Sequence, residues 1–146
     1  MCENLEQTLA LASVLGQKLR GGEVIELMSD LGGGKTTFVR GLAAGMGSLD
    51  RVSSPSFTLT NQYKAGDLTL QHFDFYRLSE PGIMRDELAE VVADPKMVTV
   101  VEWGGIVDDV LPAERLTIAI TATTETGREL VFTYPTSLSY LMEQLI

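Results

Sequence analysis

Cysteine, histidine and positive charge are all scarce in this sequence. Its 146 residues include one cysteine, Cys2, and one histidine, His72. A lone cysteine cannot form an internal disulfide, and the two residues together supply too few ligands for a zinc site. The formal net charge is −9, which argues against binding nucleic acid by neutralising its phosphates. We therefore expect any contact with RNA to run through a partner protein.

Long apolar runs are also missing. No stretch approaches the roughly 20 apolar residues that a membrane helix needs. The first residues carry Glu3 and Glu6 and no basic segment, so no targeting signal is recognised. We expect no membrane association and a cytoplasmic protein. The length and the hydrophobic content of 45% are typical of one globular domain, which we place at residues 1–146.

A glycine-rich stretch over residues 29–37 carries the strongest signal, and it reads Ser-Asp-Leu-Gly-Gly-Gly-Lys-Thr-Thr. A strand pattern over residues 23–28 precedes it, and apolar residues at helical spacing follow over residues 38–46. This order is typical of a phosphate-binding P-loop. Glycines let backbone N–H groups approach phosphate oxygens, and the helix N-terminus adds donors and partial positive charge.

The P-loop hypothesis gives individual residues a role. Lys35 is placed to reach the terminal phosphates of a nucleotide, and the Thr36 hydroxyl can ligate Mg²⁺. Ser29 stands where the pattern G-x-x-x-x-G-K-[ST] has its first glycine. The alternative is a glycine-rich turn between strand and helix that binds no ligand. The predicted nucleotide-binding residues of the loop are Leu31, Gly32, Gly33, Gly34, Lys35, Thr36 and Thr37.

The remaining patterns predict an α/β protein. We expect a P-loop NTPase-like three-layer fold, in which helices flank a mixed central sheet with a parallel core and antiparallel hairpins. Other helices are expected over residues 4–20, 79–93 and 137–146. Hairpins are expected over residues 57–75, with a four-residue connection at 64–67, and over residues 116–134. The apolar run at 97–101 predicts a central strand covered on both faces.

Two strand ends carry acids suited to the chemistry. Glu102 leaves the strand at 97–101, a position typical of an acid that holds Mg²⁺; a solvent-facing acid is the alternative. Asp74 ends the preceding hairpin and is our candidate for orienting or deprotonating the attacking water. His72 is the other candidate base, although its ring can instead pack or form a hydrogen bond at the strand end. The hydroxyl-rich loop at 52–59 can reach Mg²⁺ or the γ-phosphate, or form an ordinary turn.

Four linked motifs, at residues 30–37, 54–58, 72–78 and 101–103, resemble in order and spacing those of the bacterial TsaE (YjeE/YdiB) family. The resemblance implies a weak ATPase of tRNA threonylcarbamoyladenosine synthesis that uses ATP and Mg²⁺. It implies a complex with a threonylcarbamoyltransferase subunit (TsaD-like) and its companion (TsaB-like). The ATPase would then contact tRNA only indirectly, through this complex. The supported product is N6-threonylcarbamoyladenosine at position 37 of tRNAs that read codons beginning with A.

The resemblance also assigns residues. It places Lys35 and Thr36 on phosphate and Mg²⁺, Glu102 at the metal, and Asp74 as the acid needed for hydrolysis. Trp103 matches the tryptophan that follows the metal-holding acid, and we include it in the nucleotide site. Residues 54–58 match a switch-like loop. The sequence departs from the family at Ser29 for glycine, Gly33 for alanine and Ser56 for threonine.

Other functions are less consistent with the sequence. A GTPase would need an Asn-Lys-x-Asp run after a strand, and none is present. A small-molecule kinase would need an acceptor pocket and usually an arginine-rich lid, whereas the arginines here are scattered. A nucleotide-gated binding module with incidental hydrolysis stays open. No arginine finger is identified; Arg77 is a candidate, and a strand-end ion pair is the alternative role for it. We therefore expect slow hydrolysis by the isolated protein.

Overall fold

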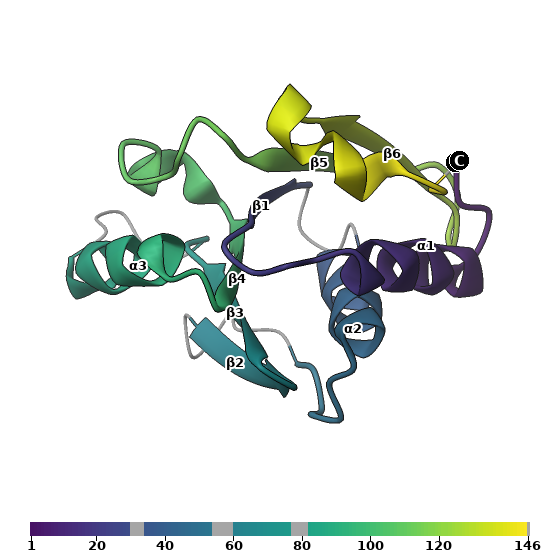
Figure 1. The fold of residues 1–146 in the computed structure, drawn as a ribbon. Coiled ribbons are helices and arrows are strands. Elements are labelled where there is room, and N and C mark those ends of the chain that lie inside the picture. Colours follow the sequence, from purple (N-terminus) through teal and green to yellow (C-terminus); the bar gives the residue numbers. More distant parts are fainter. Residues whose placement is uncertain (30–33, 54–59, 77–81, 146) are drawn as a thin grey trace.

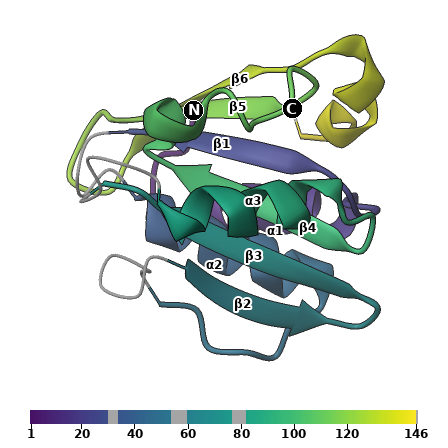
Figure 2. The same ribbon diagram turned by 90° about the vertical axis from the view of Figure 1, so that its left-hand side faces the viewer.

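The computed structural model describes residues 1–29, 34–53, 60–76 and 82–145 (Figure 1). Within these ranges six strands form one sheet in the order β2-β3-β4-β1-β5-β6 (Figure 2). The four inner strands are parallel, and each edge strand pairs antiparallel with its neighbour. The strands are β1 (Val24–Met28), β2 (Thr60–Ala65), β3 (Leu68–Asp74), β4 (Met97–Glu102), β5 (Leu116–Ala122) and β6 (Arg128–Thr133).

Helices cover both faces of the sheet, which confirms the expected three layers. The helices α1 (Leu5–Gln17) and α2 (Lys35–Met46) pack on one face, and α3 (Ile83–Ala93) lies on the other (Figure 1). Two short 3₁₀ helices, η1 (Gly104–Val107) and η2 (Thr136–Met142), follow β4 and β6. Among the helices of the described ranges, none combines the length and the apolar character needed to cross a membrane.

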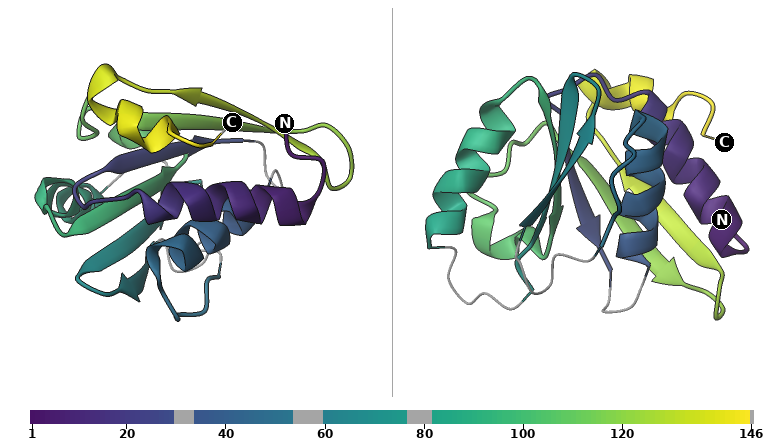
Figure 3. Two further views of the ribbon diagram at one scale, coloured as in Figure 1. Left: turned by 45° about the vertical axis from the view of Figure 1, so that its right-hand side comes forward. Right: turned by 90° about the horizontal axis from the view of Figure 1, so that it is seen from below.

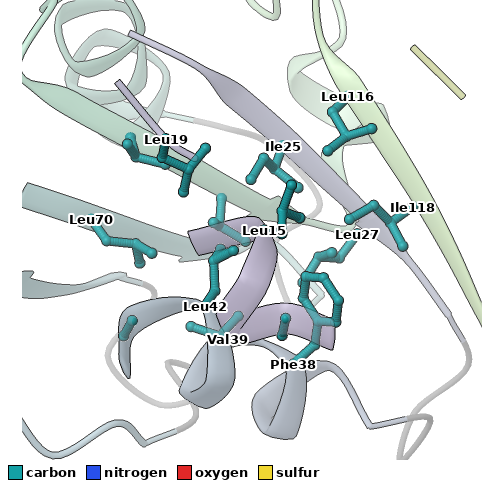
Figure 4. Close-up of a cluster of buried hydrophobic side chains, with 14 of the residues drawn as sticks. Leu15, Leu19, Ile25, Leu27, Phe38, Val39, Leu42, Leu70, Leu116 and Ile118 are labelled. Carbon is teal, nitrogen blue, oxygen red and sulfur yellow. The ribbon is translucent and has the colours of Figure 1, made fainter. Parts of the chain in front are cut away.

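The alternation of side chains along β4 produces two hydrophobic clusters. Val98 and Val100 belong to the larger cluster beneath α1 and α2 (Figure 4), which also contains Leu15 and Phe38. Val101 points to the opposite face and packs in the smaller cluster beside α3. Because successive side chains of a strand point to opposite faces, a strand with both faces covered needs apolar residues throughout. The predicted central strand is therefore confirmed.

An asparagine cap and a glycine mark ends of the helices α1 and α2. The Asn4 side chain accepts a hydrogen bond of 2.9 Å from the Gln7 backbone N–H and caps α1. Gly47, at φ 95°, ends α2 in the left-handed conformation that glycine adopts without strain. The helix α1 ends at Gln17 rather than at residue 20.

Two expectations were wrong in detail. The first hairpin has a two-residue turn, because Ala65 pairs directly with Leu68 and only Gly66 and Asp67 remain outside the ladder. Gly66 has a φ of 64°, which a tight hairpin turn requires. The C-terminal helix is the 3₁₀ helix η2, which ends at Met142 and not at residue 146.

The helices α1 and α2 approach each other closely at glycines. A Cβ atom on Gly45 would lie 2.0 Å from the Ser13 carbonyl oxygen, and one on Gly16 would lie 2.3 Å from the Leu42 carbonyl oxygen. Real Cβ atoms do not approach other atoms so closely, so the two backbones are in direct contact here. This contact fixes the position of α2, and with it the residue that opens α2, Lys35.

We therefore expect Gly45→Ala to destabilise the fold by about 1–3 kcal/mol, because the added methyl forces the two helices apart. Urea unfolding measures this change. Gly105→Ala is the matched control, since a Cβ there meets nothing within 4 Å. Equal unfolding midpoints for the two variants would contradict the proposed helix contact.

Candidate nucleotide-binding site

Three elements bring polar side chains to the carboxyl edge of the parallel strands. Asp74 ends β3 and Glu102 ends β4, and the two residues are paired across the adjacent strands. Leu27 of β1 is the other partner of Glu102. The helix α2 begins at the edge toward which β1 points (Figure 3, right). Ligands of open α/β sheets bind at this edge.

Both acids point to the face of the sheet that α2 covers. Leu70 of β3 and Val100 of β4 lie in the cluster packed beneath α1 and α2. Side chains two residues apart share a face, so Asp74 and Glu102 lie on the same side as α2. Both are buried, with 5% and 3% of their surface exposed. Carboxylates buried in this way require polar partners.

Lys35 supplies one partner. Its Nζ atom lies 3.7 Å from Glu102 Oε1 and donates a hydrogen bond of 3.1 Å to the Ser29 carbonyl oxygen. Lys35 is the first residue of α2, and its ammonium group therefore lies between the end of β1 and the end of β4. Gly34 precedes it at φ 100° and ψ 17°, a left-handed conformation suited to glycine. No described side chain caps α2 at its N-terminus, which leaves backbone donors of that turn suited to an anion.

His72 supplies the second partner of Glu102. It is fully buried, and its Nε2 atom lies 2.5 Å from Glu102 Oε2. Its Nδ1 atom makes no hydrogen bond within the described residues. His72 lies two residues before Asp74 along β3, so the imidazole contacts the carboxylate from the side away from the carboxyl edge of the sheet. Hydrogen bonding at the strand end was one role that the sequence suggested for His72, and the 2.5 Å contact identifies Glu102 as the partner.

The residues on the outer side of the site are aromatic. Asp74 Oδ1 accepts a 3.0 Å hydrogen bond from the Tyr76 backbone N–H. The Tyr76 ring packs against Trp103, with 4.9 Å between the centroids, and the Trp103 ring lies 5.2 Å from Lys35 Nζ. Trp103 is 39% exposed and has a φ of 57°. Such a conformation is costly for a residue other than glycine and is common at functional sites.

The structure thus brings Lys35, Asp74, Glu102 and Trp103 together at one edge. Thr36 and Thr37 lie half-buried in the first turn of α2. Several predicted residues lie outside the described ranges, namely Leu31, Gly32, Gly33, the loop at 54–58 that contains Ser56, and Arg77.

The donor set fits a hard cation that arrives with a nucleotide. The described residues contain no group of three or more His, Cys, Asp or Glu side chains that could hold a metal alone. Mg²⁺ is usually bound through one or two carboxylates together with substrate phosphates, and needs no complete protein cage. The carboxylate of Glu102 and the hydroxyl of Thr36 supply oxygen ligands of the required kind.

A parallel sheet core, a strand followed by a glycine-ended loop, and a helix opened by Lys-Thr define a P-loop type of α/β protein. The profile of a family described as threonylcarbamoyl adenosine biosynthesis protein TsaE matches residues 2–130. The chain therefore belongs to the TsaE family, a family of nucleotide-binding P-loop ATPases that acts in threonylcarbamoyladenosine biosynthesis in tRNA. The resemblance found in the sequence motifs is confirmed.

Individual relatives agree with this membership. The tRNA threonylcarbamoyladenosine biosynthesis protein TsaE of Bacillus subtilis (strain 168) is 39% identical over 134 residues, covering 89% of this chain and 81% of the relative. The protein of the same name from Treponema pallidum (strain Nichols) is 38% identical over 125 residues, covering 86% and 92%. The crystal structure of Bacillus subtilis YdiB matches 97% of this chain and 88% of its own, with a TM-score of 0.75 and 35% identity.

Ser29 gives the first test of the site. Trp103 and Gln144 are the non-glycine residues with positive φ in the described part of the chain, and Ser29 is not among them. Glycine therefore gains nothing at this position, and Lys35 bonds to a backbone oxygen that glycine retains. We expect Ser29→Gly to cost up to ~1 kcal/mol of stability through unfolded-state entropy, with unchanged ATP affinity by calorimetry.

The opposite change, Gly34→Ala, is the control for this test, because a φ of 100° strains any residue with a Cβ. Tighter nucleotide binding by Ser29→Gly would mean that the loop needs a glycine-like conformation at residue 29. Weaker binding would mean that the serine hydroxyl contacts the ligand.

Proposed function

We propose that this chain is a single P-loop ATPase domain that binds ATP with Mg²⁺ at the edge formed by α2, β3 and β4 and hydrolyses it slowly. The observation that carries the proposal is the buried contact of 3.7 Å between Lys35 Nζ and Glu102 Oε1, beside Asp74. A lysine at the start of a helix, next to two strand-end acids, is the arrangement that phosphoryl transfer requires.

The chain's own groups do most of this chemistry by position and charge. The backbone N–H groups around Gly34 and the first turn of α2 bind phosphate oxygens. Lys35 donates to the terminal phosphates, and Glu102 and Thr36 hold the metal. Bound Mg²⁺ would neutralise the charge that develops on the transferred phosphoryl group. Lys35 and Glu102 already contact each other, so the lysine needs only a small movement to exchange a carboxylate partner for a phosphate.

Asp74 is the residue we propose to orient the attacking water. It lies at the carboxyl edge beside Glu102 and is 5% exposed, whereas His72 is fully buried behind Glu102. A group must lie within hydrogen-bond reach of the water to take its proton. His72 would have to displace Glu102 to do so, and we assign it the role of holding that carboxylate in place.

The proposed biological role is to support formation of N6-threonylcarbamoyladenosine at position 37 of tRNAs that read codons beginning with A. We propose that the protein acts in a complex with the threonylcarbamoyltransferase subunit and its companion. Family membership and the names of the relatives support this role. The net charge of −9 supports indirect contact with tRNA, through the complex, because an acidic surface repels the phosphate backbone.

A second candidate function is a nucleotide-gated binding module. The exposed aromatic pair Tyr76 and Trp103 favours it, because the Trp103 ring lies 5.2 Å from Lys35 Nζ. A nucleotide that draws Lys35 toward its phosphates would alter this pair on the surface. Partner binding would then respond to ATP whether or not hydrolysis followed.

Removing Lys35 tests nucleotide binding itself. We expect Lys35→Ala to weaken ATP·Mg²⁺ binding about tenfold or more, since charge-assisted hydrogen bonds contribute about 1.5–3 kcal/mol. Isothermal titration calorimetry measures the affinity. Lys96→Ala is the matched control, because Lys96 is exposed and lies outside the site. Equal affinities for Lys35→Ala and the parent would rule out the P-loop assignment.

The two acids are distinguished by a pair of amide substitutions. We expect Glu102→Gln to weaken the Mg²⁺ dependence of ATP binding. We expect Asp74→Asn to bind ATP almost normally while turnover falls by 10²-fold or more, because orienting water matters only in the transition state. Phosphate release and tRNA modification with the reconstituted partner enzymes are the measurements.

Parental hydrolysis by Asp74→Asn would show that the catalytic assignment is wrong. If that variant stops hydrolysing ATP yet supports many rounds of tRNA modification, ATP acts as a binding switch. A nucleotide-gated binding module would then describe this protein better than an enzyme does.

A further inference from the structure

Arg128, the first residue of β6, contacts the end of the phosphate-binding loop. The residue is 8% exposed, and a Cβ atom built on Gly34 would lie 3.1 Å from its Nε atom and 3.9 Å from its Cζ atom. Gly34 caps α2 and directly precedes Lys35. The hairpin of β5 and β6 and the start of α2 lie at the same edge of the molecule (Figure 3, right).

The hairpin holds this arginine rigidly. Its Nη1 atom donates to the carbonyl oxygens of Thr124, Glu125 and Gly127, at 3.3, 3.3 and 2.7 Å. Its backbone N–H and C=O groups bond to those of Cys2, at 2.7 and 2.8 Å. These hydrogen bonds already order the Arg128 side chain, so it loses little further conformational freedom when it contacts Gly34.

The contact also restricts what can occupy position 34. The guanidinium approaches the Gly34 Cα from the side where any other residue would carry its Cβ, and the φ of 100° already favours glycine there. The three heavy atoms nearest to that Cβ position, Nε, Cδ and Cζ, all belong to Arg128, so displacement of the guanidinium would remove this contact. The direction of the backbone N–H groups at the start of α2 depends on the conformation at this glycine.

We propose that Arg128 is a positioning residue that holds Gly34 and the start of α2 in the conformation that binds the nucleotide. This inference rests on the proposed nucleotide site. It makes the β5–β6 hairpin, together with the N-terminal segment paired to it at Cys2, part of the binding machinery. By linkage, nucleotide binding in turn stabilises the hairpin contacts around Arg128.

Substitution of Arg128 tests this role. We expect Arg128→Ala to weaken ATP binding about tenfold by calorimetry, at a temperature where circular dichroism shows the variant folded. The ATP affinity of Arg128→Lys should lie between those of the parent and of Arg128→Ala, because an ammonium keeps the charge but not the planar guanidinium with its several donors. Arg128→Lys also keeps the test decisive if Arg128→Ala does not fold.

Arg115→Ala is the matched control. Arg115 also binds a turn, through Glu26 at 3.2 Å, the Pro112 carbonyl at 3.0 Å and Asp108 at 2.9 Å. Glu26 precedes Leu27 along β1, so this network lies on the sheet face opposite α2. We expect Arg115→Ala to lower the unfolding midpoint and to leave ATP affinity at the parental value.

Hydrogen exchange supplies a measurement that a purely structural role would not move. We expect ATP to slow exchange of the Arg128 and Thr123 amides, which bond to Cys2 and Gly127, and we expect Arg128→Lys to lose this protection. Parental affinity in either folded Arg128 variant, or an equal loss of affinity in Arg115→Ala, would overturn the inference. Lys35→Ala, measured in parallel, distinguishes failure of the proposed nucleotide site from failure of the proposed role of Arg128. If Lys35→Ala binds ATP with parental affinity, the nucleotide site itself is wrong. If Lys35→Ala loses binding and the Arg128 variants do not, only the role of Arg128 is wrong.

Discussion

The site is organised by one buried carboxylate, Glu102. Its two oxygens contact Lys35 of α2 and His72 of β3, at 3.7 and 2.5 Å. An isolated charge in the interior is strongly unfavourable, and removing one partner of a buried ion pair typically costs about 3–5 kcal/mol. The three elements are therefore constrained to meet at this point. A buried ion pair adds little net stability over a well-packed apolar group. The proposed reaction, and not stability, therefore accounts for the presence of these charges.

The position of Lys35 depends equally on packing far from the site. Gly16 and Gly45 let the backbones of α1 and α2 touch, and Phe38 and Leu42 anchor α2 in the core beneath them. Interiors are packed at the density of organic crystals, so such a contact leaves α2 little room to slide. At its other end, α2 begins at Gly34, which Arg128 contacts from the β5–β6 hairpin. The lysine is thus positioned from two directions.

Sequence reasoning located the elements well because their signals are local. The strand at 97–101 and the helix that follows the glycine-rich stretch are each predicted from a few neighbouring residues. The turn of the first hairpin was placed wrongly because pairing of Lys64 and Ala65 with β3 outweighs the turn tendency of that segment. The C-terminal helix ends at Met142 and not at residue 146, because Glu143 is extended and Gln144 has a φ of 63°.

The sequence by itself determined the class of site. A strand, a glycine loop and Lys35-Thr36 define the chemistry, because phosphate binding at a helix N-terminus requires only residues that are neighbours in the chain. It also named Asp74 and Glu102 as strand-end acids. Only the tertiary structure decided that His72 contacts Glu102 and that Arg128 contacts Gly34. These pairs depend on the strand order and the register of the sheet, which arise from the packing of the whole chain and leave no periodic signal in the sequence.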